Sequence, residues 1–185
     1  MTDFLSDASR ILALPDDPSA SLQRLARAAV PGLADFCLIF LRDGPEIRCA
    51  AIAHATAEGT SVLRRLIAIY RITPDDPLST VALAMRLGRP QLRSAIGIET
   101  QARVSRAEVL TLHRQLGCRS ALVVPIGAAP RVLGALSFCY STSAREYSAR
   151  DVRPARRVAA LVERYLRGAA QPPPLRRRQG RLWAR

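Results

Sequence analysis

The chain has 185 residues, of which 49% are hydrophobic, and a formal net charge of +13. This length suits a single domain that buries its core without disulfides or metal ions, and no apolar stretch is long enough to span a membrane. The four cysteines show no Cys-x-x-Cys spacing, and the N-terminus lacks a basic region ahead of a long apolar run. We therefore expect a cytoplasmic protein without a metal site, whose cysteines are small buried hydrophobic residues.

All 28 basic residues are arginines, and the chain contains no lysine. Such a bias is typical of GC-rich coding sequences, so the number of arginines carries little functional information. Their distribution is more informative, because residues 145–185 hold 12 arginines and three acids, whereas residues 1–144 hold 16 arginines and 12 acids. Residues 168–185 are rich in proline and arginine and are expected to form a disordered tail.

After an N-terminal extension of residues 1–16, the chain is expected to form a helix and then a pair of strands. Asp17 suits an N-cap and Pro18 suits the first helical position, and apolar residues follow at helical spacing. Residues 34–42 and 47–55 are apolar runs joined by a tight Asp-Gly-Pro turn. A turn this short predicts two antiparallel strands.

The middle of the chain is expected to be mostly helical. Residues 61–71 carry apolar side chains at helical spacing, which indicates a helix with one buried face. A second helix is predicted from an N-cap at Asp76 to Leu87, where glycine and proline follow. A short edge strand over residues 91–94 and a helix over residues 105–116, which opens with a capping box, complete this part.

Two apolar runs near the C-terminal end predict a β-hairpin. Residues 120–126 and 132–140 flank a short connection and are rich in valine, leucine, isoleucine and aromatic residues. Strands this continuously apolar are typical of a sheet that is covered on both faces. We therefore expect these two strands at the centre of the sheet.

Alternation of side chains divides this hairpin into a face of large residues and a face of small residues. The large face carries Leu122, Val124, Ile126, Leu136, Phe138 and Tyr140, and the small face carries Ala121, Val123, Pro125, Ala135, Ser137 and Cys139. A face of small residues leaves volume that either a closely packed helix or a ligand must fill. The residues alone leave both alternatives open.

The last helix is predicted to open with a capping box at residues 148–151, and Pro154 predicts a kink or a start near Asp151. The chain thus reads as helix, two strands, helical insertion, short strand, helix, two strands and helix. This order predicts the α+β class with a central antiparallel sheet, because a parallel fold would alternate strands and helices strictly.

Four segments give the chain a resemblance to a known family. Residues 33–44, 51–55, 87–92 and 116–138 follow one another as the strands and strand connections of GAF domains do. The resemblance covers residues 17–167 and is closest to the GAF domains of bacterial signalling proteins, where they accompany histidine kinases, PP2C-type phosphatases or transcription regulators.

The resemblance implies that the first and last helices lie on one face of the sheet and form a homodimer interface. It also implies a small-molecule pocket on the other face, under the helical insertion. The residues expected to face this pocket are Phe36, Leu38, Phe40, Tyr70, Ala121, Val123, Ser137 and Cys139. We therefore expect a non-catalytic regulatory domain that binds a small molecule or a signalling-protein partner and acts through its terminal helices, with no membrane association.

The ligand is unknown, but several GAF ligands lack their sequence signature here. The Asn-Lys-Phe-Asp-Glu pattern of cyclic-nucleotide-binding members cannot be present, because the chain has neither asparagine nor lysine. Covalent bilin attachment uses a cysteine beside a histidine, and neither His54 nor His113 has a cysteine next to it in the sequence. A haem or metal ion would need an axial histidine or a cluster of ligands, and the two histidines are far apart in the chain.

Two alternative functions remain. The free methionine sulfoxide reductases resemble this chain, but their chemistry needs a reactive cysteine and a resolving partner, and no cysteine lies between Thr56 and Gly117, which leaves Cys118 alone before the hairpin. A nucleic-acid-associated regulator could bind phosphates through the basic tail and stack a base on Trp183. The tail arginines are Arg176, Arg177, Arg178, Arg181 and Arg185. No helix-turn-helix pattern accompanies them.

Overall fold

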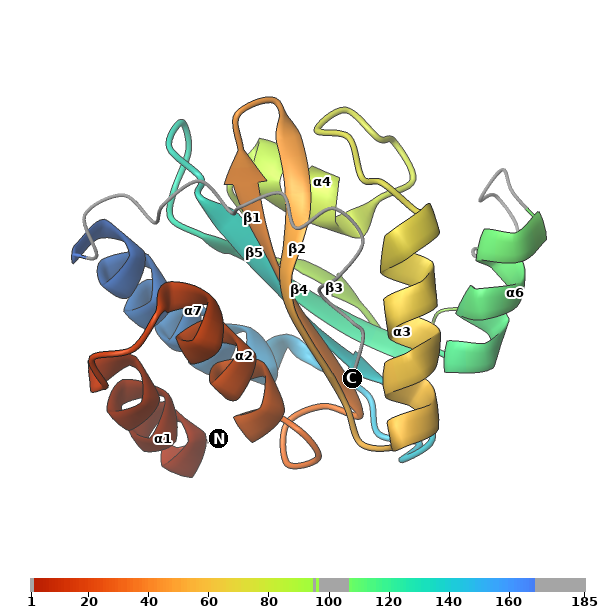
Figure 1. The fold of residues 1–185 in the computed structure, drawn as a ribbon, viewed down its shortest axis with the longest axis horizontal. Helices are drawn as coiled ribbons and strands as arrows, with labels where there is room; N and C mark the ends of the chain where they lie inside the picture. Colours follow the sequence, from red (N-terminus) through yellow and green to blue (C-terminus); the bar gives the residue numbers. More distant parts are fainter. Residues whose placement is uncertain (1, 95, 97–106, 169–185) are drawn as a thin grey trace.

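The computed structural model describes residues 2–94, 96 and 107–168, and its centre is a five-stranded sheet (Figure 1). The strands are β1 (Phe36–Asp43), β2 (Glu46–His54), β3 (Gln91–Arg93), β4 (Ser120–Ile126) and β5 (Gly134–Tyr140). Their order is β2-β1-β5-β4-β3, and every neighbouring pair is antiparallel. The predicted α+β class is confirmed, and the two strands of the apolar hairpin occupy inner positions of the sheet, as expected.

Gly134 allows the neighbouring strands β1 and β5 to pair closely. A Cβ atom at this position would lie 2.1 Å from the carbonyl oxygen of Phe40, which is backbone and cannot rotate away. The close approach therefore requires glycine at the first residue of β5.

Three helices cover one face of the sheet: α1 (Thr2–Ala13), α2 (Pro18–Ala28) and α7 (Ala149–Gly168) (Figure 1). The predicted N-cap is confirmed, because the Asp17 carboxylate accepts hydrogen bonds from the amides of Ser19 and Ala20. Helix α1 was not expected from the sequence. It packs against α2 and α7 and contributes the buried side chains Phe4 and Ala8 to the core.

Helix α7 begins at Ala149 and continues through Pro154. This start agrees with the predicted opening at residues 148–151, and the later start near Asp151, one of the two alternatives that Pro154 suggested, is not observed. The carboxylate of Asp151 accepts hydrogen bonds from both the amide and the hydroxyl of Ser148. The bond from the amide is one half of the predicted capping box, whereas the Asp151 amide donates to the Ser148 carbonyl oxygen rather than to its hydroxyl.

The other face is covered by α3 (Ala57–Ile69), α4 (Thr80–Leu87) and α6 (Ala107–Leu116), which lie beyond the sheet from α1, α2 and α7 (Figure 1). Helix α4 is shorter than predicted, since its N-cap is Ser79 and not Asp76. The Asp76 carboxylate instead accepts from the amides of Leu78 and Ser79 and holds the turn before the helix. The capping-box residue Ser105 lies outside the described residues.

Two hydrophobic cores lie on the two faces of the sheet. The large residues of β4 and β5 belong to the core under α1, α2 and α7, and these are Leu122, Val124, Ile126, Leu136, Phe138 and Tyr140. Ala121, Val123, Ala135 and Cys139 belong to the core under α3, α4 and α6. The predicted division into a large and a small face is confirmed. Among the described residues, no helix is long and apolar enough to cross a membrane.

Candidate functional site

Strand register brings seven of the eight predicted pocket residues together on one face of the sheet. Cys139 on β5 lies opposite Phe36 on β1 and Ala121 on β4. One pair of residues along, Ser137 lies opposite Leu38 and Val123. Phe40 follows on β1 and faces the same core. These residues form one continuous surface, which we call the small-residue face after the small side chains that β4 and β5 contribute to it. It consists of Phe36, Leu38, Phe40, Ala121, Val123, Ser137 and Cys139.

The small-residue face is covered by the helical insertion. Its seven side chains are between 2% and 7% exposed, and Leu63 of α3, Met85 of α4 and Leu112 of α6 belong to the same core. The covering helices therefore occupy most of the volume over this face. Leu38 and Ala121, each 7% exposed, are the most exposed of the seven.

Tyr70, the eighth predicted residue, lies at the end of α3 and is half-buried. Its hydroxyl donates a 2.7 Å hydrogen bond to the carboxylate of Asp76, and its ring contacts the edge of His113 on α6 at a centroid distance of 6.1 Å. Burial, with a further contribution from Asp76, raises the pKa of Tyr70. Tyr70 therefore stays protonated and ties α3 to the turn before α4 and to α6.

Two thiols that the sequence analysis treated separately meet beside the small-residue face. Cys118, just before β4, donates a 3.7 Å hydrogen bond from Sγ to the carbonyl oxygen of Ser120, and its thiol interacts with that of Cys139 on β5. The interaction with Cys139 and burial raise the pKa of the Cys118 thiol. Burial also raises the pKa of Cys49 to about 12 and raises the pKa of Cys37 on the opposite face. All four cysteines are free thiols.

The two histidines lie in separate surroundings. His54 at the end of β2 stacks on Phe36 at a centroid distance of 5.6 Å, and its Nδ1 accepts a 3.0 Å hydrogen bond from the Thr56 amide. Burial lowers the pKa of both His54 and His113. Within the described part of the chain, no three histidine, cysteine or acidic side chains gather in a way that could hold a metal ion.

Asp35, just before β1, is a buried carboxylate that the sequence analysis missed. It is 3% exposed and accepts hydrogen bonds from the amides of Ser141 (2.7 Å) and Ser143 (2.9 Å) and from the Ser143 hydroxyl (2.8 Å). Burial raises the pKa of Asp35, but these hydrogen bonds and the nearby Arg145 outweigh burial and hold the pKa below its ordinary value. Asp35 thus fastens the start of β1 to the segment that leads into α7.

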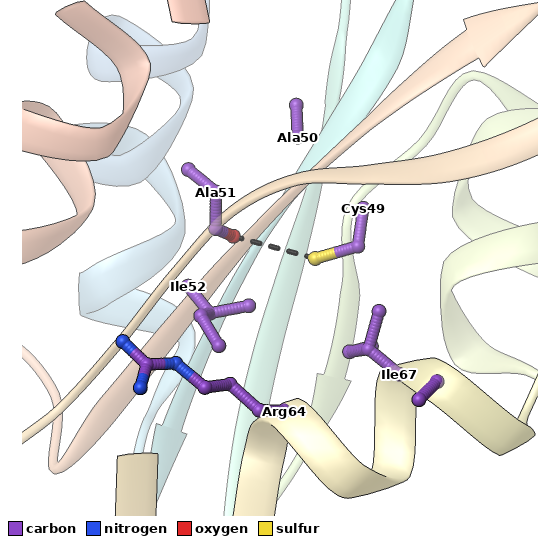
Figure 2. Close-up of a pocket in the computed structure, with 7 residues that line it drawn as sticks. Cys49, Ala50, Ala51, Ile52, Arg64 and Ile67 are labelled. Carbon is purple, nitrogen blue, oxygen red and sulfur yellow. Dashed lines mark hydrogen bonds between the residues drawn. The ribbon is translucent and has the colours of Figure 1, made fainter. Parts of the chain in front are cut away.

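Two pockets lie along the outer edge of β2, away from the small-residue face. The smaller has a volume of about 160 Å³ and lies between β2 and α3, where Arg64 extends along Ile52 (Figure 2). The larger has a volume of about 380 Å³ and lies between α2, the end of β2 and α3. None of the eight predicted residues lines either pocket. The tail arginines lie outside the described residues.

The architecture is an antiparallel sheet with three helices on one face and a helical insertion on the other, which defines a three-layer α+β domain. A family model described as GAF domain matches residues 16–167. The chain therefore belongs to the GAF domain family, whose members are most often sensor or regulatory domains. None of the curated proteins matches the chain.

Solved structures agree with this assignment. The GAF domain of the phosphoenolpyruvate-protein phosphotransferase from Acinetobacter has a TM-score of 0.64 and 15% identity, covering 91% of this chain and 93% of that chain. GAF-B of DevS from Mycobacterium smegmatis has a TM-score of 0.56 and 21% identity, covering 83% and 95%. The free methionine-R-sulfoxide reductase from Neisseria meningitidis, solved with its substrate, has a TM-score of 0.62 and 15% identity, covering 88% and 86%. Identities this low establish a shared fold alone.

Proposed function

We propose that this GAF domain is a non-catalytic regulatory module that binds a small molecule on the small-residue face and transmits binding to its terminal helices. One observation carries the proposal. The strands β1, β4 and β5 present the small-residue face to the insertion and, on their other side, large residues to the core under α2 and α7. A ligand on one face therefore lies one sheet thickness from the helices on the other.

The proposed mechanism is a shift between two populated arrangements. A ligand that packs better under α3, α4 and α6 in one arrangement would favour that arrangement, and the sheet would pass the change to α2 and α7. Tyr70 is placed to take part, because its hydrogen bond to Asp76 and its contact with His113 hold the insertion together. A ligand that reached Tyr70 would exchange these contacts for its own.

We further propose a homodimer through the terminal helices. Several apolar side chains on α1 and α7 are only partly buried in the single chain, and these are Leu5, Ile11, Leu12, Val152, Leu161 and Tyr165. A second copy of the chain that covers them would remove apolar surface from water. Helix α1 would then belong to the dimer layer together with α2 and α7.

The protonation of the thiols supports a role without catalysis. Sulfoxide reduction by cysteine needs a thiolate. The pKa of Cys118 is raised, by its interaction with Cys139 and by burial, so its thiol stays protonated near neutral pH. With its thiol protonated, Cys118 is a weak nucleophile at neutral pH.

A screen of metabolites by thermal unfolding tests the binding proposal. A ligand of the small-residue face raises Tm in the natural protein and loses this effect in Val123→Phe, which fills the face, while Leu161→Glu on α7 retains the effect. Light scattering tests the dimer: the natural chain is expected as a dimer and Leu161→Glu as a monomer. A Tm shift that persists in Val123→Phe would show that the ligand binds elsewhere on the protein.

A further inference from the structure

The larger pocket at the edge of β2 is a basic groove. Its lining comes from the C-terminal half of α2 and the residues after it, the end of β2, and α3, and it consists of Gln23, Arg27, Val30, Pro31, Ile52, Ala53, His54, Ala55, Thr60 and Arg64. The volume of about 380 Å³ lies within the range of sites for small organic ligands. Among the described residues, two arginines and a histidine line the groove and no acidic residue does, although the charge of the nearby Asp35 acts on His54.

The two arginines and the histidine come from three different elements. Arg27 lies in the last turn of α2, and Arg64 lies on α3, across the groove. His54 is at the end of β2 and uses Nδ1 to accept from the Thr56 amide. In its neutral form His54 therefore carries its proton on Nε2 and offers an N–H donor. Guanidinium groups bind phosphate and carboxylate oxygens in pairs of hydrogen bonds.

The edge of β2 itself is already occupied, so an added peptide strand does not fit. The Gln23 side-chain amide donates a 2.6 Å hydrogen bond to the carbonyl oxygen of Ile52 and accepts from its amide. Further along the same strand, Ile47 forms a bridge with Ile72. An extended peptide would need these same backbone groups. The groove suits a compact ligand that uses the side chains beside the strand.

We propose that this groove is a binding site for a small organic oxyanion, a phosphate ester or a carboxylate, held between Arg27 and Arg64 with His54 as a further donor. The site differs from the small-residue face, because none of its lining residues belongs to that face, although His54 stacks on Phe36. It therefore goes beyond the function proposed above.

A bound oxyanion would link the two helical layers. Helix α2 packs with the core on one face of the sheet, and α3 packs with the core on the other. The groove lies between Arg27 and Arg64, and the Gln23 hydrogen bonds to Ile52 tie α2 to the edge of β2. An anion shared by both arginines would hold α2 and α3 in a fixed relation.

Titration followed by amide and arginine side-chain NMR tests this site, with inorganic pyrophosphate and succinate as separate probes on the full chain. Binding is expected to move the signals of Ala53, Ala55 and Thr60 and of the two arginines. Arg27→Gln and Arg64→Gln are each expected to weaken binding by about tenfold or more, the effect of losing one charge-assisted hydrogen bond. The probe that binds more tightly identifies phosphate or carboxylate as the preferred group.

Arg65→Gln is the matched control, because Arg65 is exposed on the same helix and lines neither pocket. It is expected to leave the affinity unchanged, and thermal unfolding checks that each variant is folded. The proposal is overturned if neither probe moves these signals, or if Arg65→Gln weakens binding as much as Arg64→Gln, which would indicate attraction by the net charge of +13 alone. Neither result depends on a ligand of the small-residue face.

Discussion

The two faces of the central sheet are packed in different ways. On one face, large side chains such as Leu136, which is 1% exposed, belong to the core under α2 and α7, on which α1 packs. On the opposite face, alanine, serine and cysteine lie under short helices joined by long connections. The same strands thus present large side chains to one core and, from β4 and β5, smaller side chains to the other. Stability and ligand binding can then be changed separately, because adjacent residues of a strand serve different faces.

The largest expected difference between the faces is between two neighbours on β5. Leu136→Ala removes a fully buried side chain from the large face and is expected to lower the free energy of unfolding by about 3 kcal/mol. Ser137→Ala changes the small-residue face, where the Ser137 hydroxyl makes one long 3.6 Å contact with Cys139, and is expected to cost less than about 1 kcal/mol. Urea unfolding measures both, and equal losses would contradict the distinction.

Asp35 is expected to make the stability of the fold depend on pH in the acid range. Its pKa is lowered in the folded protein, so the unfolded chain takes up the proton first as the pH falls. Its contribution is complete above the ordinary value of 3.8 and is lost as the pH falls below it toward the lowered folded-state pKa. Asp35→Asn is expected to lose about 2 kcal/mol near neutral pH, because the amide cannot accept all of the hydrogen bonds.

Urea unfolding from pH 7 to pH 2 separates this effect from general acid destabilisation. The difference in free energy of unfolding between the natural protein and Asp35→Asn is expected to shrink below pH 4. A difference that stays constant over this range would show that the Asp35 charge does not stabilise the fold.

Adding volume to the core is expected to lower the free energy of unfolding by different amounts on the two faces. Ala159→Leu inserts a larger side chain between α7 and the sheet, where the packing is complete, and is expected to cost about 1–3 kcal/mol. Ala121→Leu adds the same atoms to the small-residue face and is expected to cost less than about 1 kcal/mol, because the ligand site proposed there would take up the added atoms. A larger loss for Ala121→Leu, measured by urea unfolding, would mean that the small-residue face is filled.

The smallest expected effect concerns the insertion. Tyr70→Phe removes the hydrogen bond to Asp76 from a half-buried position and is expected to lower the free energy of unfolding by about 1 kcal/mol or less. Hydrogen exchange is expected to increase at amides of the turn before α4, such as Ser79, and to stay unchanged in α7. A uniform increase would contradict a local role for Tyr70.

Local signals in the sequence predicted much of the fold. The Asp17 cap, the antiparallel pairs and the large and small faces of the hairpin each follow from residues close together in the chain. Helix α1 carries a similar signal, because Phe4, Ala8, Ile11 and Leu12 lie at helical spacing, and the prediction overlooked it. The start of α4 was misplaced because Asp76 suits a turn as well as a helix cap.

Features that depend on distant parts of the chain could not be predicted. Asp35 finds its partners at residues 141–145, and Cys118 meets Cys139 through the register of β4 and β5. The basic groove joins α2, β2 and α3, so Arg27 and Arg64 gave no local sign of a shared site. The eight pocket residues came from the GAF resemblance together with strand alternation, and their binding role stays a prediction.

Native mass spectrometry tests the central claim most directly. The natural protein and Ala121→Leu are each incubated with a concentrated metabolite extract of the cells that produce the protein, desalted gently and weighed intact. We predict an additional non-covalent mass per subunit on the natural protein that is absent from Ala121→Leu. Two proteins at their bare polypeptide masses, or the same additional mass on both, would contradict ligand binding on the small-residue face.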